Sequence, residues 1–268
     1  MKSTQVWTFK TNLNQGSIPF PSFTIMCVDI GYKAALGPNG LPLKIKGVKI
    51  KKEYADADLD QPHLQAHARP TCWTLIEKNH TPEVVTMHWG LVADFMIDRP
   101  DQFQKYGNSF FNARSERILE HNAAWFQYIN NRCLLIADGV YEHQKVKGRT
   151  RKMPWYIRLA SGELMLIPAL YNPRTETFAI LTREGNELFR NIHNAGANKF
   201  RMPLLLPPEQ ALRWIEPNIQ TSDIQELIGQ EIPSEGLAAH TVFSIRGNTL
   251  RPDKKELNDL YNWETICL

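Results

Sequence analysis

Four polar side chains from distant parts of this 268-residue sequence have the chemistry of a nucleophilic site. They are the thiol of Cys27, the amide of Asn112, the carboxylate of Glu142 and the imidazole of His193. Covalent catalysis needs a nucleophile, a group that orients it, and acid–base groups that move protons. The other three side chains would therefore have to be arranged around Cys27.

Cys27 stands out from the other cysteines because it directly follows Met26. A chain that began at Cys27 would carry a free α-amine and a thiol on one residue. An α-amine has a pKa of about 7.7–8, so much of it is deprotonated at neutral pH, unlike a lysine with a pKa near 10.4. Such a residue can attack an aldehyde with its nitrogen and then close with its sulfur to a thiazolidine.

The other cysteines predict no second site. Cys72 and Cys133 lie within apolar, strand-like runs and are expected in the core, and Cys267 is next to the C-terminus with nothing arranged around it. Neither a CxxC pair nor disulfide-framework density is present, which indicates a reducing compartment. Without an apolar run that could span a membrane or act as a signal peptide, we expect a cytoplasmic protein. We also expect no metal and no cofactor, since HExxH, paired CxxC and glycine-rich phosphate loops are all missing.

The composition is that of an ordinary globular protein, with 43% hydrophobic and 22% charged residues. A net charge of +3 is too small to indicate a general nucleic-acid binder, so any DNA contact must be a local patch. Short strand-like runs with few helices predict a single α+β domain with a strongly curved, barrel-like antiparallel sheet and peripheral helices. We predict strands over 43–52, 71–77, 84–88, 132–137, 155–159, 164–169, 178–182 and 240–245. We predict helices over 116–128, 184–193, 207–215 and 222–228.

These elements would position the candidate side chains. Asn112 and Arg114 alternate in a strand-like stretch, so both should face the same side. Glu142 follows the predicted strand 132–137, and a carboxylate at the end of a buried strand is expected to have a raised pKa. His193 ends a predicted helix. Taken alone, Glu142 is better explained as a salt-bridged residue at a strand end and His193 as a structural histidine.

Together, the contexts of these residues resemble the SRAP family of SOS response-associated peptidase-like proteins. The resemblance runs from residue 26 to about 250, which divides the chain into residues 1–25, an extension, propeptide or misassigned start, and a domain over 26–268. The motifs that carry it are Met26-Cys27, Trp89-Gly90-Leu91, Asn112-Ala113-Arg114-Ser115-Glu116, Asp138-Gly139-Val140-Tyr141-Glu142, Ile192-His193-Asn194 and Arg201-Met202-Pro203.

The resemblance implies a protein that captures abasic sites in single-stranded DNA and would associate with the nucleoid when bound. We expect a monomer, since nothing in the sequence suggests a coiled coil or obligate pairing. Capture would be a covalent thiazolidine crosslink through a terminal Cys27. By motif position, Asn112 would hold the amine, Glu142 would shuttle protons in imine formation and autoproteolysis, and His193 would assist opening of the sugar ring. The implied DNA contacts are Arg114 and Arg201 to phosphate. Phe95 and Met96 could form an apolar wedge against an unstacked base, although core packing explains Met96 nearly as well.

Several features depart from the family pattern, among them Ala93 and Phe95 in the motif that begins at Trp89, and His143 after Glu142. The usual start is Cys-Gly-Arg, whereas this chain has Cys27-Val28-Asp29, and an acid here should weaken DNA binding near the nucleophile. The loop between His193 and Arg201 is longer than usual. Residues 1–25 would turn the Cys27 amine into an amide, which requires a misassigned start, cleavage after Met26, or lost chemistry.

Two other functions compete with aldehyde capture. A cysteine hydrolase could use Cys27, His193 and Asn112 on an external peptide or amide, and it would tolerate an internal cysteine. A non-covalent DNA-binding protein could use Arg114, Phe95 and the basic run 145–152. Only aldehyde capture predicts a covalent DNA adduct that disappears when the Cys27 amine is blocked.

Overall fold

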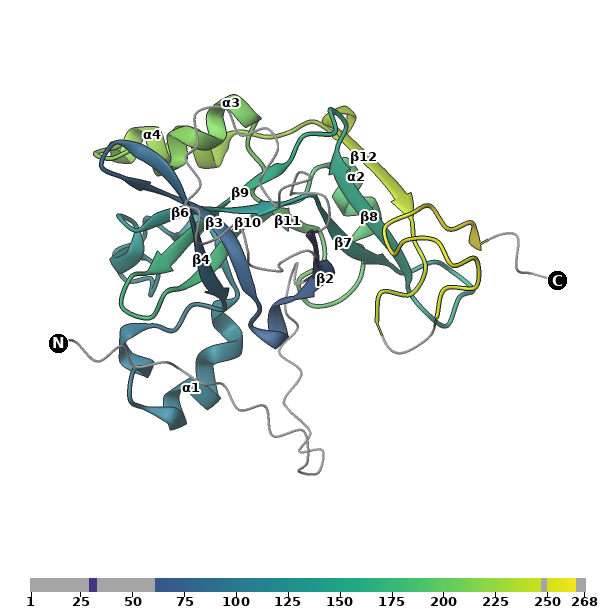
Figure 1. Ribbon diagram of the computed structural model, residues 1–268, viewed down its shortest axis with the longest axis horizontal. Coiled ribbons are helices and arrows are strands. Elements are labelled where there is room, and N and C mark those ends of the chain that lie inside the picture. The colour runs from purple at the N-terminus through teal and green to yellow at the C-terminus, as the bar shows by residue number, and fades with distance from the viewer. Residues whose placement is uncertain (1–28, 33–60, 247–249, 264–268) are drawn as a thin grey trace.

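The structure, a computed structural model, describes residues 29–32, 61–246 and 250–263. Cys27, Cys267, the extension 1–25 and the predicted strand 43–52 lie outside the described residues. Two β-sheets form the body of the described part, with helices at its periphery (Figure 1). This arrangement confirms the predicted α+β class. No helix in the described ranges is long and apolar enough to cross a bilayer.

The first sheet is antiparallel throughout and has the strand order β12-β8-β7-β1-β2. Its short strand β1 lies beside β7, with Ile30 paired to Val140 and Gly31 to Gly139. The strand bounds are β1 Asp29–Tyr32, β2 Gln61–Gln65, β7 Gly139–Gln144, β8 Met153–Leu159 and β12 Leu237–Thr241.

The second sheet curls back on itself. Its order is β11-β10-β4-β3-β6-β9, and β9 also pairs with β10. The parallel seam between β10 and β4 contains only the pairs Thr177–His88 and Phe178–Trp89. The prediction of a strongly curved sheet is therefore confirmed, although the short seam makes it a curled sheet instead of a true barrel. The strand bounds are β3 Thr71–Lys78, β4 Thr81–Trp89, β5 Asn112–Arg114, β6 Arg132–Ala137, β9 Met165–Asn172, β10 Thr177–Glu184 and β11 Arg201–Pro203.

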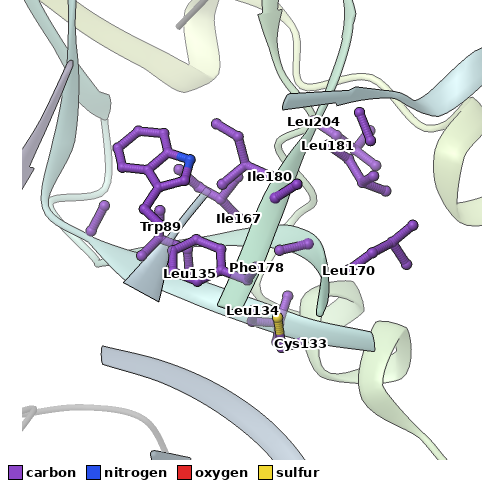
Figure 2. Packing of buried hydrophobic residues seen from close by; sticks show 14 of the residues in the cluster. Trp89, Cys133, Leu134, Leu135, Ile167, Leu170, Phe178, Ile180, Leu181 and Leu204 are labelled. Carbon is purple, nitrogen blue, oxygen red and sulfur yellow. The ribbon is translucent and has the colours of Figure 1, made fainter. Parts of the chain in front are cut away.

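The core lies within this curled sheet (Figure 2). Trp89 on β4 stacks on Phe178 of β10, with ring centroids 6.2 Å apart. Strand β6 is buried along its whole length, and its Cys133 is fully enclosed, as is Cys72 on β3. Burial raises the pKa of both thiols, so they stay protonated and inert. The prediction that these two cysteines are core residues is confirmed.

The helices are short and lie at the edges of the sheets. In Figure 1, α3 and α4 lie at one end of the second sheet and α1 at the other. The bounds are α1 Pro100–Tyr106, α2 Glu187–Ile192, α3 Pro208–Ala211 and α4 Thr221–Gly229. Short 3₁₀ segments are Ala66–Ala68, Asp94–Met96, Gly107–Phe110, Ser115–Arg117, Phe126–Tyr128, Leu212–Ile215 and Ser234–Gly236.

The prediction of a helix over 116–128 is wrong. The chain there forms two isolated 3₁₀ turns, Ser115–Arg117 and Phe126–Tyr128. Ile118 and Tyr128 are buried, and the Tyr128 hydroxyl accepts a hydrogen bond from the Asp94 N–H at 2.9 Å. These tertiary contacts outweigh the modest helix propensity of so short a segment.

Candidate functional site

Strand β5 positions Asn112 and Arg114 on one side of the second sheet. It pairs in parallel with β10, so Asn112 lies opposite Ile180 and Arg114 opposite Thr182. Alternate residues of a strand share a face, as predicted. Asn112 is partly buried and Arg114 is exposed, so the amide lies deeper than the guanidinium.

Glu142 lies inside β7, opposite Trp155 of β8, and its residue is 6% exposed. The prediction that it ends the buried strand 132–137 is wrong. Strand β6 ends at Ala137 and β7 begins at Gly139, with only Asp138 between them. The turn needs glycine because a Cβ at Gly139 would lie 2.5 Å from the ring of Tyr156. Glu142 is therefore held by strand pairing within the first sheet.

His193 caps the C-terminal end of α2, where its N–H donates to the carbonyl of Phe189 at 2.7 Å. Its Nδ1 lies 2.9 Å from the carbonyl oxygen of Arg201. A carbonyl only accepts, so Nδ1 carries the proton and Nε2 the lone pair of the neutral ring. Nδ1 is also 3.8 Å from Glu142 Oε1, too far for a hydrogen bond. The structure thus brings together an imidazole and a carboxylate that are both nearly buried.

Arg201 is committed to internal contacts. It lies on β11 opposite Glu184 of β10, and its guanidinium binds both carboxylate oxygens of Glu116 at 2.7 and 2.9 Å and the Thr182 carbonyl at 2.8 Å. Burial alone would raise the pKa of Glu116, but the hydrogen bond and charge of Arg201, together with backbone hydrogen bonds, more than offset burial and hold this pKa below its usual value. Arg114 instead remains exposed and donates to Asn198 Oδ1 at 3.3 Å. Of the two predicted phosphate contacts, Arg114 is the more accessible.

Met96 and Phe95, the two residues predicted to form an apolar wedge, also differ in exposure. Met96 is 2% exposed and packs in the core, so it is not available to a ligand in this structure. Phe95 is 39% exposed, with its ring edge-on to Tyr106 and Phe110. Of these two residues, only Phe95 could meet a base.

A second buried carboxylate, that of Asp29, lies on β1, the strand next to β7. The sequence did not predict its hydrogen-bond partners. Asp29 on β1 is 3% exposed and accepts hydrogen bonds from His63 Nε2, at 2.7 Å, and from Arg246 Nη2. Burial alone would raise its pKa, but His63 and Arg246 more than offset this and hold it below the usual value. Asp29 was expected to be an acid that repels phosphate, yet its charge is compensated internally.

Arg246 is 217 residues from Asp29, so no local spacing could have predicted their contact. With His63 bound to Asp29, the part of the chain that the structure describes contains no group of three metal-ligating side chains. Glu142 and His193, which the structure brings together, are residue types that carry out acid–base chemistry. Glu142 comes from β7, which pairs with β1, and His193 is held by α2 and β11.

Comparison with known proteins supports the same reading of the motifs. The sequence model of the family described as "SOS response associated peptidase (SRAP)" matches residues 42–248, more than half of the chain. The chain belongs to the SRAP family. The match contains Asn112, Glu142, His193 and Arg201, the residues that carried the resemblance after Met26-Cys27.

Relatives of this SRAP chain occur in bacteria and vertebrates. It is 28% identical over 180 residues to abasic site processing protein YoqW of Bacillus subtilis (strain 168), covering 64% of this chain and 75% of YoqW. It is 26% identical to abasic site processing protein YoaM of the same organism, over 75% of this chain and 86% of YoaM. The vertebrate protein HMCES of Rattus norvegicus, also named for abasic site processing, is 23% identical over 62% of this chain and 54% of HMCES.

Solved structures share the fold. A crystal structure of a protein from Bacteroides thetaiotaomicron superposes with a TM-score of 0.66 at 23% identity, covering 87% of this chain and 97% of that one. A second, from Bordetella bronchiseptica, has a TM-score of 0.62 at 19% identity over 81% of this chain and all of the other. At such identities the likeness concerns the fold alone.

Proposed function

We propose that this SRAP protein captures abasic sites in single-stranded DNA through a terminal Cys27. The observation that carries the proposal is the nearly buried pair Glu142 and His193, 3.8 Å apart, on and beside the strand next to β1. Asp29, the first residue of β1, is two residues after Cys27 in the chain. Relatives named abasic site processing proteins support the choice of substrate.

The proposed capture has two steps and needs no cofactor. The α-amine of Cys27 attacks the aldehyde carbon of the ring-opened sugar, and loss of one water leaves an imine. The thiol then adds across the imine: sulfur bonds to carbon, and its proton passes to nitrogen, which closes the thiazolidine. Glu142 carries the protons of these steps, as a nearly buried carboxylate beside an imidazole can do.

His193 serves the opening of the sugar ring. Its Nδ1–H is held by the Arg201 carbonyl, so its Nε2 is the atom that exchanges a proton with the sugar hydroxyl. Asn112, partly buried on β5, holds the amine of Cys27. Exposed Arg114 binds a backbone phosphate and exposed Phe95 meets a base, so DNA is recognised by a local patch on a monomer.

The amine must be exposed before capture. In self-cleavage, water adds to the Met26 carbonyl and the bond to the Cys27 nitrogen breaks, leaving a carboxylate on Met26 and an amine on Cys27. Glu142 is the base that activates this water. The same amine would also arise from translation at Met26 followed by removal of that methionine.

A denaturing-gel assay tests the proposal. The full chain, a chain starting at Met26 and its Cys27→Ala variant are each mixed with single-stranded DNA that contains one abasic site. We expect a covalent band from every preparation whose intact mass shows a free Cys27 amine, and none from Cys27→Ala. A band that survives in Cys27→Ala, or no band from a preparation whose intact mass shows a free Cys27 amine, would overturn the proposal. Peptide cleavage by a chain with a blocked Cys27 would favour the cysteine hydrolase.

A further inference from the structure

The loop 194–200, which joins His193 to β11, ends in an aromatic residue with an unusual backbone. Phe200 has a φ of +66°. This left-handed region disfavours residues with a Cβ, and bulky aromatic residues occupy it rarely. Strained residues of this kind persist only where surrounding contacts hold them, and they gather at functional sites.

Two backbone hydrogen bonds hold Phe200 in this conformation. Its N–H donates to the carbonyl of His193 at 2.7 Å, and its carbonyl accepts from the Gly185 N–H at 2.7 Å. The residue is thus tied to the candidate catalytic histidine and immediately precedes Arg201. Despite these ties, Phe200 is 36% exposed. The backbone of Phe200 is therefore fixed, but burial in the core does not explain why its side chain is aromatic.

The rest of the loop is anchored around the same site. At its start, Asn194 exchanges two hydrogen bonds with the backbone of Lys145, at 2.8 and 3.1 Å. In its middle, Asn198 accepts from Arg114, and the ammonium of Lys199 lies 4.9 Å from the centre of the Phe200 ring. An exposed ring with a cation over it, in a loop that also binds an exposed arginine, is the pattern of single-strand binding surfaces.

We propose that Phe200 is a stacking platform for a nucleobase next to the abasic position, with Lys199 neutralising the adjacent phosphate. An abasic nucleotide leaves the neighbouring base without a stacking partner on one side, and an aromatic side chain can replace that partner. The strained backbone holds the ring at the surface instead of letting it fold into the core. This inference rests on the proposed function, because it assigns a contact of the same site.

The test uses single-stranded DNA with a tetrahydrofuran abasic analogue, which has no aldehyde, flanked by fluorescent 2-aminopurine. The variant Phe200→Gly removes the ring and also accepts a positive φ without strain. We expect its melting temperature to be equal to or higher than that of the unmodified protein. Its affinity for the analogue should fall roughly 5- to 150-fold, and quenching of the aminopurine should be lost.

Two further variants separate stacking from packing. Phe200→Trp should keep the affinity and the quenching, whereas Phe200→Leu, which is apolar but not aromatic, should lose both. The charge-neutral control Asn218→Gly relieves an exposed positive φ of 61° elsewhere and should leave DNA binding unchanged. Wild-type affinity in Phe200→Leu, or an unchanged affinity in Phe200→Gly, would overturn the inference.

Crosslinking of the unmodified protein to aldehyde-containing DNA is measured in parallel. If the protein crosslinks but analogue binding ignores Phe200, this inference alone fails. If it does not crosslink while analogue binding still requires an aromatic residue at position 200, the covalent step fails and the stacking contact stands.

Discussion

Asp29 and Glu142 are both nearly buried carboxylates on adjacent strands of the first sheet, and each faces a histidine. Asp29 is 2.7 Å from His63 and also binds Arg246. Glu142 is 3.8 Å from His193, whose Nδ1 donates to the Arg201 carbonyl instead. His63 is hydrogen-bonded to Asp29, whereas His193 is held close to Glu142 by its hydrogen bond to the Arg201 carbonyl.

The difference separates a carboxylate fixed by two side-chain partners from the one to which we assign proton transfer. A buried charge that is fully hydrogen-bonded to a histidine and an arginine is fixed, and its pKa is lowered. A carboxylate and an imidazole held just beyond hydrogen-bond distance leave Nε2 of the histidine for a reactant. The compensated charge of Asp29 also explains how an acid can stand where the family pattern has an arginine.

The largest expected effect comes from Glu142→Gln, which keeps the shape of the side chain but cannot carry a proton. We expect the single-turnover rate of crosslink formation to fall about 100-fold or more. Asp29→Asn is the matched control and should slow the reaction less than about tenfold by the same measure. Equal losses in the two variants would erase the distinction between the carboxylates.

Asp29→Asn should instead reduce stability. Removal of the charge leaves the buried hydrogen bonds from His63 and Arg246 without their ionised acceptor, at a cost of about 2 kcal/mol. Urea denaturation measures this loss. Glu120→Gln, which breaks an exposed pair with Arg117, should change the free energy of unfolding by less than about 0.5 kcal/mol. A similar change in the free energy of unfolding in Asp29→Asn and Glu120→Gln would show that the contacts of Asp29 with His63 and Arg246 do not stabilise the fold.

The pH dependence of stability sharpens the comparison. Burial and the charge of Arg246 lower the pKa of His143, next to Glu142, to about 4; Lys152 and His63 act in the same direction, against Asp29. Between the ordinary value of 6.5 and about 4, the unfolded chain binds more protons than the folded one. The contribution of His143 is therefore complete above pH 6.5 and is lost as the pH falls towards 4.

Urea denaturation over this range measures the effect, and His143→Gln should flatten the profile. The contribution of Asp29, whose pKa is lowered from 3.8, should be lost only at more acidic pH. An unchanged slope between pH 6.5 and 4 in His143→Gln would contradict the assignment.

The smallest expected effect concerns Arg114 and Arg201, the two arginines predicted to bind phosphate. Arg114→Gln should weaken binding to single-stranded DNA a few-fold and reduce the salt slope by about one. Arg201→Gln should mainly lower the melting temperature, because it breaks the pair with Glu116 and the bond to Thr182. Salt titrations and thermal melts of both variants check this. If Arg201→Gln reduced the salt slope more than Arg114→Gln did, Arg201 and not Arg114 would be the main phosphate contact.

The sequence predicted those features that a local pattern encodes. Continuous apolar runs located β3, β6 and β10, because buried strands need such runs. Alternation placed Asn112 and Arg114 on one face, and the helix ending at His193 was also found.

Features that depend on distant partners were not predicted. The Asp29–Arg246 contact joins residues 217 positions apart, and the helix expected over 116–128 yielded to the burial of Ile118 and Tyr128. Glu142 was expected at a strand end because the one-residue link at Asp138 is too short to be recognised as a boundary between two strands. The positive φ of Phe200 likewise arises from hydrogen bonds to His193 and Gly185, not from its own sequence context.

The most direct test of aldehyde capture is tandem mass spectrometry of the purified crosslink after digestion with trypsin and nuclease. The account predicts a peptide that begins at Cys27 and carries the sugar remnant on that residue, with its mass lower by one water than the sum of peptide and sugar fragment. A remnant on a lysine, or on a peptide in which Met26 still precedes Cys27, would contradict it.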